Sequence, residues 1–186
     1  MDNLSQRIKK MVRKLIVSAL VSLDGYIADQ NGDVLGLERF YHDHLPAGKG
    51  DFRVPKNIDT IIVGKKTYES YRGSLAQMKQ KKIIILTHQF KPDLPANMSC
   101  FAGEVSELFE NLQATSGKDI WLFGGAKAID QFVCYDLIDQ IRLVTLPFNL
   151  EHGTMLFDVS HKAPTVKLES LENKDEMTYS IWTRLS

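Results

Sequence analysis

Apolar runs alternate with amphipathic segments along the chain, and most of the runs end at a glycine or a polar turn. Aliphatic and β-branched runs without polar alternation are typical of strands buried on both faces of a sheet. Five segments fit this pattern and are predicted strands: residues 15–23, 60–63, 82–87, 120–123 and 141–147. Residues 177–184 alternate between apolar and polar side chains, which predicts an exposed or edge strand that pairs antiparallel.

Amphipathic segments separate several of these strands. We predict a helix over residues 65–71, a second that begins with Ser106 as its N-cap and ends by Gly117, and a third directly after Gly124-Gly125. The aromatic and charged stretch 34–57 is expected to hold one helix and a loop. Apolar strands joined by helices favour a three-layer α/β/α domain with a mostly parallel central sheet.

Composition limits the classes of protein. A chain of 186 residues with 44% apolar content suits a single domain, which we place at residues 12–186, with 1–11 as an N-terminal extension. The 23 basic and 23 acidic residues balance, so no overall charge favours nucleic acid or an anionic membrane. Cys100 and Cys134 form no C-x-x-C pair and are expected to be reduced, buried thiols of a cytoplasmic protein. We predict no signal peptide, membrane span, disulfide or zinc site.

Three of the predicted strands end in groups that suit an anion. In such folds ligands bind beyond the carboxyl ends of the strands, where helix N-termini present backbone N–H groups. The three groups are Gly64-Lys65-Lys66-Thr67, Thr87-His88-Gln89 and Gly124-Gly125-Ala126-Lys127. Glycine allows a phosphate to approach the backbone closely, although a Gly-Gly pair alone could equally be a tight turn. Together, the three strand ends predict a phosphate-bearing ligand.

The order of these motifs resembles the dihydrofolate reductase-like superfamily, and within it the reductase domain of bacterial riboflavin biosynthesis and its free-standing relatives. The resemblance extends from about residue 12 to residue 182. It rests on five segments in sequence: SLDGYIA (22–28), GKKTYE (64–69), IIILT (83–87), LFGGAKAIDQF (122–132), and Pro147 followed by Gly153 and Leu156-Phe157. It implies a dihydrofolate reductase-like fold with an antiparallel C-terminal strand.

The resemblance also implies NADPH as hydride donor. Carried over by position, Ala19, Leu20, Ile27 and Ala28 line the nicotinamide side, and Gly124, Gly125, Ala126 and Lys127 hold the pyrophosphate. The residues that hold the adenosine end and its 2′-phosphate are Gly64, Lys65, Lys66, Thr67, Thr87 and His88. The family usually has arginine at position 65, and lysine keeps the charge but lacks the bidentate fork. We therefore expect NADPH to be preferred to NADH.

The proton donor is harder to assign. Dihydrofolate reductases place a carboxylate on the helix before the second strand, and reduction of a C=N bond is easiest when the nitrogen is protonated. Asp51 lies in the corresponding stretch, with Glu38, His42, Asp43 and His44 as competitors, and Asp24 is either a site carboxylate or a turn residue. The basic residues that could contact a substrate phosphate are Arg39, Lys49 and Arg53.

The resemblance implies an NADPH-dependent reductase of a small pyrimidine- or pteridine-type heterocycle. The first expectation is a reductase like that for 5-amino-6-(5-phosphoribosylamino)uracil in riboflavin biosynthesis, and a homodimer is expected by family analogy. The alternatives are a dihydrofolate reductase and a non-catalytic NADP(H)-binding regulator. Four aromatic side chains are expected to pack within the protein and not to act in catalysis: Tyr68, Tyr71, Trp121 and Trp182. The spacing of His42 and His44 could suit a metal, but no third ligand stands out.

Overall fold

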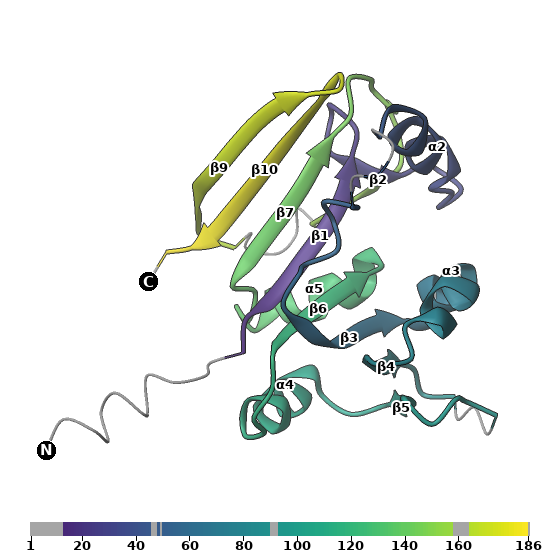
Figure 1. The fold of residues 1–186 in the computed structure, drawn as a ribbon, viewed down its shortest axis with the longest axis vertical. Helices are drawn as coiled ribbons and strands as arrows, with labels where there is room; N and C mark the ends of the chain where they lie inside the picture. The colour runs from purple at the N-terminus through teal and green to yellow at the C-terminus, as the bar shows by residue number, and fades with distance from the viewer. Residues whose placement is uncertain (1–12, 46–47, 49, 90–92, 158–163, 186) are drawn as a thin grey trace, which may run out of the picture.

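A computed structural model describes residues 13–45, 48, 50–89, 93–157 and 164–185. The predicted extension 1–11 and Lys49 lie outside these residues. An eight-stranded sheet forms the centre of the molecule, in the order β5-β4-β3-β6-β1-β7-β10-β9 (Figure 1). From its β5 edge inward, the strands are β5 (Met98–Phe101), β4 (Lys82–Leu86), β3 (Ile58–Gly64), β6 (Asp119–Gly124), β1 (Leu15–Val21), β7 (Gln140–Thr145), β10 (Met177–Arg184) and β9 (Val166–Lys174).

Strand direction follows the prediction. All pairs from β5 to β7 are parallel, whereas β10 pairs antiparallel with both β7 and β9. A second sheet of two strands, β2 (Tyr26–Ala28) and β8 (Thr154–Met155), lies beside β1. The four helices of the described residues are α2 (Leu35–His44), α3 (Lys65–Gln77), α4 (Val105–Gln113) and α5 (Ala126–Cys134).

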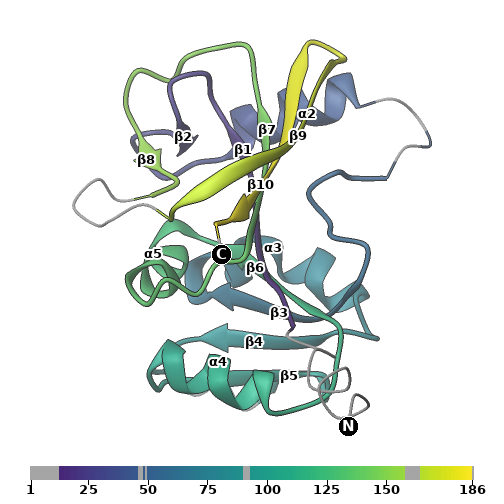
Figure 2. The same ribbon diagram turned by 90° about the vertical axis from the view of Figure 1, so that its left-hand side faces the viewer.

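The helices cover both faces of the sheet. Side chains alternate between the two faces along each strand, so neighbouring residues of one strand contact different helices. Ile62 packs with the apolar sides of α4 and α5, while its neighbours Ile61 and Val63 pack with α3 on the other face. Leu20 of β1 packs with α2, and Trp121 of β6 packs with α3. Helices α2 and α3 therefore cover the same face of the sheet (Figure 2). The predicted three-layer α/β/α arrangement is therefore confirmed.

Two parts of the strand prediction were wrong. The segment 177–184 is a strand, but it lies inside the sheet between β7 and β9, and β9 is the edge. The sequence of β9, VKLESLENK, is charged and almost wholly exposed, so it lacks the apolar signal that identifies a buried strand. The short strand β5 was missed as well, since only Met98 of its four residues is buried.

Three local predictions also need correction. The helix predicted from Ser106 starts at Val105 with Glu104 at the N-cap, because the buried Val105 side chain joins the core. The helix predicted over 65–71 continues to Gln77, with non-helical backbone angles at Tyr71. Both cysteines are free, but neither is buried: Cys100 is partly exposed and Cys134, the last residue of α5, is exposed. The apolar side of α5 instead packs through Ile129 and Phe132.

Candidate active site

A cavity of about 370 Å³ lies where β1, β3 and β6 end, between α2 and α3. Residues from six elements line it: Ser18, Ala19 and Leu20 of β1; Ile27 of β2; Leu37, Glu38 and His42 of α2; Lys66, Thr67, Ser70, Tyr71 and Ser74 of α3; Trp121, Phe123 and Gly124 of β6; and Ile129 of α5. The cavity therefore sits at the edge of the sheet where ligands bind in folds of this kind. Its two ends differ in chemistry.

Glycines form one end. Val63 is paired with Gly124 in the sheet, so β3 and β6 finish side by side. Gly64 and Gly125 are the N-caps of α3 and α5, and a Cβ added to Gly64 would stand 3.7 Å from the backbone nitrogen of Gly125. Two helix N-termini thus meet here. A Cβ on Gly125 would lie only 2.8 Å from the Thr67 hydroxyl oxygen, so a side chain here would force Thr67 or the start of α5 to shift.

An ion-paired cluster forms the other end. The Arg53 guanidinium donates through Nη1 to Glu38 Oε1 at 2.7 Å and through Nη2 to Asp51 Oδ2 at 2.7 Å. Its Nε also donates to both Asp51 oxygens at 3.1 Å. The side chains of Glu38, Asp51 and Arg53 are 17%, 24% and 16% exposed, so the cluster is mostly buried yet still reaches the cavity.

Tyrosines complete this cluster. Tyr71 donates its hydroxyl hydrogen to Glu38 Oε1 at 2.7 Å, and Tyr41 donates to Asp51 Oδ1 at 3.0 Å. Burial first, and then the neighbouring carboxylate, raises the pKa of each tyrosine, so both are neutral donors at physiological pH. Burial opposes the ionised form of Asp51, but the hydrogen bonds and charge of Arg53 outweigh it and lower the Asp51 pKa.

Aromatic side chains form the wall between the two ends. Trp121 donates its indole N–H to the Ser18 hydroxyl at 2.6 Å, which fixes the ring against β1. Phe123 lies 4.8 Å from the Trp121 ring and 5.1 Å from the Tyr71 ring, measured between centroids. This wall suits the face of a flat ring, since offset and edge contacts between aromatic rings are favourable.

Eight of the residues predicted from the sequence line the cavity together: Ala19, Leu20, Ile27, Asp51, Lys66, Thr67, Gly124 and Gly125. The other eight are not among the described residues that line it: Asp24, Ala28, Gly64, Lys65, Thr87, His88, Ala126 and Lys127. Several of these still adjoin the glycine end. Lys65 donates to Gln89 Oε1 at 2.6 Å, which joins the start of α3 to the turn after β4. That turn contains Thr87 and His88.

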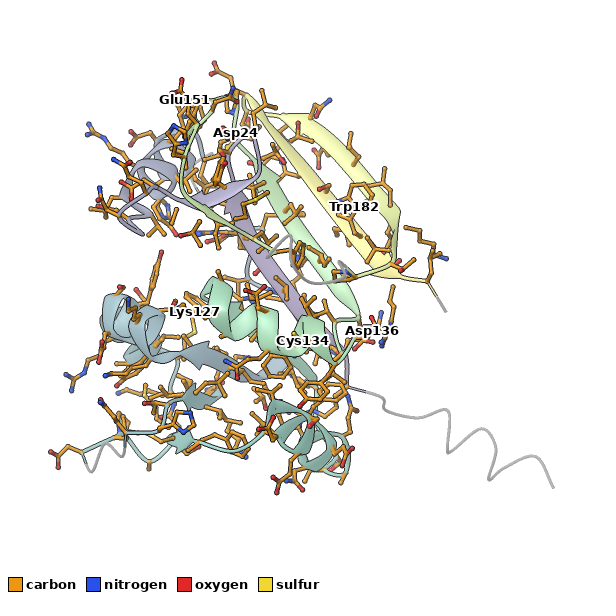
Figure 3. The ribbon with its side chains drawn as sticks, turned by 180° about the vertical axis from the view of Figure 1, so that it is seen from behind. Asp24, Lys127, Cys134, Asp136, Glu151 and Trp182 are labelled. Atoms are coloured by element: carbon orange, nitrogen blue, oxygen red, sulfur yellow. The ribbon has the colours of Figure 1, made fainter. Side chains whose placement is uncertain are left out.

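Asp24 lies elsewhere. Its carboxylate accepts hydrogen bonds from the Ser22 hydroxyl and from the backbone nitrogens of Leu150 and Glu151, the latter two at 3.1 and 2.8 Å. Figure 3 shows Asp24 beside Glu151 at the upper end of the molecule. The Ser22 hydroxyl first, and then the two backbone N–H groups, lower the Asp24 pKa. Asp24 therefore connects the turn after β1 to the segment before β8.

The sequence singled out Glu38 only as a competitor for the proton donor and Arg53 as a contact for a substrate phosphate, and Tyr71 was expected to pack. In the structure Arg53 is paired with Glu38 and Asp51. One signal was available for Glu38: with His42 it has i,i+4 spacing on α2, and both line the cavity. Arg39 and Asp43 lie on the outer side of α2, 86% and 65% exposed and 3.7 Å apart. In the described part of the chain, no His, Cys, Asp and Glu side chains gather into a group that could hold a metal ion.

Comparison with known proteins gives the same fold. The chain is 20% identical to a structure from Shewanella sp. PV-4 assigned to riboflavin biosynthesis, with a TM-score of 0.75, covering 93% of this chain and 99% of that one. A diaminohydroxyphosphoribosylaminopyrimidine deaminase/5-amino-6-(5-phosphoribosylamino)uracil reductase from Thermotoga maritima is 17% identical with a TM-score of 0.65, covering 98% of this chain and 59% of that one. Dihydrofolate reductase from Enterococcus faecalis complexed with NADP(H) is 15% identical with a TM-score of 0.59, covering 93% and 97%.

Sequence similarity to two proteins of Bacillus subtilis extends over most of the chain, well beyond the five motifs described above. YwjB of Bacillus subtilis strain 168 is 30% identical over 149 residues, which cover 79% of this chain and 84% of YwjB. YyaP of the same strain is 29% identical over 161 residues, which cover 78% and 80%. The sequence model of the RibD C-terminal domain matches residues 13–179. Because this match spans most of the chain, the protein belongs to the RibD C-terminal domain family.

Proposed function

We propose that this protein is an NADPH-dependent reductase of a small pyrimidine- or pteridine-type heterocycle. The observation that carries the proposal is one cavity with two chemically different ends, a glycine-lined end beside two helix N-termini and an ion-paired end beyond an aromatic wall. The first end suits a phosphate-bearing cofactor, and the second suits a polar ring. Membership of a reductase-domain family supports the same reaction class.

The residues at the glycine end fit the cofactor. A Cβ at Gly125 would force a neighbour to shift, although the φ of −73° and ψ of −171° are accessible to any residue, so these two angles do not demand glycine. Close packing against Thr67 requires it, and the absent side chain leaves the N–H groups at the start of α5 open to a phosphate. We propose that Gly124, Gly125, Ala126 and Lys127 hold the pyrophosphate.

The remaining contacts are assigned by position. Ala19, Leu20, Ile27 and Ala28 border the nicotinamide side, and the adenosine end lies against Gly64, Lys65, Lys66, Thr67, Thr87 and His88. When bound, NADPH supplies a hydride. Lys65 and Lys66 stand at a helix start, where the helix dipole disfavours positive charge, so a phosphate nearby accounts for their placement better than solvent does. The same two charges support a preference for NADPH over NADH.

The protein groups at the other end bind and orient the substrate. Trp121 and Phe123 offer a flat apolar surface for a ring, and Glu38 offers a carboxylate for its N–H groups. Arg53 and Tyr71 fix the Glu38 carboxylate through Oε1, so its direction is set before a ligand arrives. Tyr71 keeps its proton at physiological pH, so it serves the Glu38 carboxylate as a hydrogen-bond donor. We propose that Asp51, held by Arg53, acts as a positioning residue.

Loss of NADPH absorbance with purified protein tests the function, with a panel of pterins, dihydrofolate and 5-amino-6-(5-phosphoribosylamino)uracil as substrates. We expect oxidation with at least one ring of the panel and a lower KM for NADPH than for NADH. Rapid oxidation with dihydrofolate alone would identify a dihydrofolate reductase. Tight NADPH binding without oxidation for any substrate would contradict the reductase and favour a non-catalytic NADP(H)-binding regulator.

A further inference from the structure

The segment 51–54 supplies three of the side chains that line the ion-paired end of the cavity: Asp51, Arg53 and Val54. Phe52 is not among the described residues that line it. Its side chain packs against the sheet instead, with its ring centroid 5.1 Å from that of Tyr179 on β10. Because Phe52 is bonded to both Asp51 and Arg53, its position sets where these two side chains stand in the cavity.

The backbone of this segment has few hydrogen bonds to the rest of the protein. It belongs to no helix or strand, and within the described residues its one backbone–backbone hydrogen bond is internal, from the Val54 N–H to the Asp51 carbonyl oxygen at 3.1 Å. Two side chains hold Phe52 instead. Its N–H donates to the Tyr41 hydroxyl oxygen at 3.2 Å, and its carbonyl oxygen accepts two hydrogen bonds from the Arg142 guanidinium.

Arg142 comes from the middle of β7, one strand away from the floor of the cavity. It is paired in the sheet with Ser18 of β1, which lines the cavity, whereas Arg142 is not among the described residues that do. Its Nε and Nη2 donate to the Phe52 carbonyl oxygen at 3.1 and 2.7 Å, and its Cζ lies 4.4 Å from the centroid of the Phe52 ring. Arg142 therefore contacts both the carbonyl group and the ring of Phe52.

The hydrogen bonds to Phe52 are what an arginine adds at this position. An apolar side chain could also pack on the Phe52 ring, and burial disfavours a charge here, since it lowers the pKa of Arg142. The carboxylates of Glu169 and Asp51 favour the charge in turn. A guanidinium stays protonated at physiological pH despite this shift, and its charge strengthens the hydrogen bonds that it donates.

We propose that Arg142 is a positioning residue for the substrate, because it holds the Phe52 carbonyl oxygen and so fixes Asp51 and Arg53 at the ion-paired end. This inference rests on the proposed function. Groups that are fixed before a ligand arrives bind it with a smaller loss of freedom. The glycine end comes from other elements, β3, α3, β6 and α5, so loss of Arg142 should weaken binding of the heterocycle and spare that of NADPH.

Hydrogen exchange followed by mass spectrometry tests the hold on the segment without substrate or turnover. Arg142→Met keeps an unbranched side chain against the Phe52 ring and removes both hydrogen bonds. We expect the amides of residues 52–54 to exchange at least about tenfold faster in this variant, with those of α5 unchanged. Arg142→Lys can restore one hydrogen bond and should lie between the two. Unchanged exchange in Arg142→Met would overturn the inference.

Steady-state kinetics with a heterocycle that turns over test the consequence for the substrate. We expect Arg142→Met to raise the KM of the heterocycle severalfold and to leave the KM of NADPH unchanged, and Arg142→Lys to recover part of the loss. A variant that is only less stable would contain less active protein, which lowers the apparent kcat and changes neither KM. An unchanged KM of the heterocycle, or equal effects on both KM values, would overturn the positioning role.

A matched control excludes an effect of charge alone. Lys167→Met removes one positive charge from an exposed position of the neighbouring edge strand β9 and should change neither the exchange nor the KM values. A rise in the KM of the heterocycle in this control equal to that in Arg142→Met would overturn the role assigned to the contact with Phe52. If Arg142→Met does not fold by circular dichroism, Arg142→Gln, which is uncharged and shorter, is judged by the same two measurements.

The two proposals can fail separately. Faster exchange of residues 52–54 in the variant, with no heterocycle reduced by wild type, would contradict the reductase and the effect on substrate but leave the hold of Arg142 on the segment standing. Turnover by the variant with the exchange and the KM values of wild type would support the reductase and overturn the inference.

Discussion

Replacing Gly125 with alanine separates a structural reason for this glycine from a functional one. The φ and ψ angles at Gly125 are accessible to alanine, so these two angles do not oppose the substitution. The new Cβ would lie 2.8 Å from the Thr67 hydroxyl oxygen, which is closer than real Cβ contacts allow, and either Thr67 or the start of α5 must shift. The same Cβ would also stand beside the N–H groups proposed to bind the pyrophosphate.

The two effects have different magnitudes. Forcing one extra carbon into a packed site costs about 1–3 kcal/mol of folding free energy. Loss of one hydrogen bond to a charged phosphate costs about 1.5–3 kcal/mol of binding free energy, which is about ten- to hundredfold in the dissociation constant of NADPH. We expect Gly125→Ala to lower both the free energy of unfolding and the affinity for NADPH.

A double-mutant cycle with Thr67→Ala distinguishes them. Removing the Thr67 hydroxyl relieves the protein contact but leaves the Cβ beside the cofactor, so the double variant should regain folding stability without regaining NADPH affinity relative to Thr67→Ala alone. Urea unfolding measures the first quantity and titration calorimetry the second. Gly73→Ala is the control, because a Cβ at that exposed position of α3 meets no atom within 4 Å.

Two results would refute this reasoning. Unchanged NADPH affinity in Gly125→Ala would show that no phosphate approaches this backbone. Recovery of affinity together with stability in the double variant would show that Gly125 serves only to pack against Thr67.

Three further substitutions give distinct outcomes. Arg53 lowers the Asp51 pKa below its unfolded value despite burial, so ionised Asp51 stabilises the fold at neutral pH and loses that effect as the pH falls through the folded pKa. The free energy of unfolding of wild type should therefore exceed that of Asp51→Asn at neutral pH, and the difference should shrink below about pH 4 in urea unfolding. A difference that does not change with pH would contradict the ion pair. Tyr71→Phe should cost about 1 kcal/mol in the same assay and raise the KM of the heterocycle, whereas an unchanged KM would remove Tyr71 from the site. Asp24→Ala should lower the Tm by releasing the Leu150 and Glu151 N–H groups, and a loss of NADPH affinity would mean that Asp24 does more than hold this segment.

The sequence predicted those parts of the fold whose signal is local. Strands β1, β3, β4, β6 and β7 are apolar because helices cover both of their faces, and the glycines that end β3 and β6 mark helix starts. Strand β9 carries no such signal, since an edge strand with exposed side chains tolerates Lys and Glu throughout. Its pairing with β10 follows from the hairpin between them and not from burial.

The ion-paired end of the cavity could not be predicted for a different reason. Glu38 and Tyr71 are 33 positions apart, and Glu38 and Arg53 are 15 apart across a loop. The hydrophobic pattern of the sequence does not indicate the path of such a loop. The sequence could therefore identify Asp51 and Arg53 as candidates, but not their contact with each other and with α2. The helix starts at the glycine end, in contrast, follow their strands directly.

The two ends of the cavity differ in how freely they can change. The glycine end is built from β3, α3, β6 and α5, whose strands lie in the middle of the sheet and are packed on both sides. The ion-paired end comes mainly from one connecting segment, α2 and residues 51–54, which packs on the face of β1, β7 and β10. Charge changes at the exposed positions of this segment leave the core contacts of Leu37 and Tyr41 with the sheet in place. If the proposed function holds, relatives can differ in the ring that they reduce and still share one way of holding the dinucleotide.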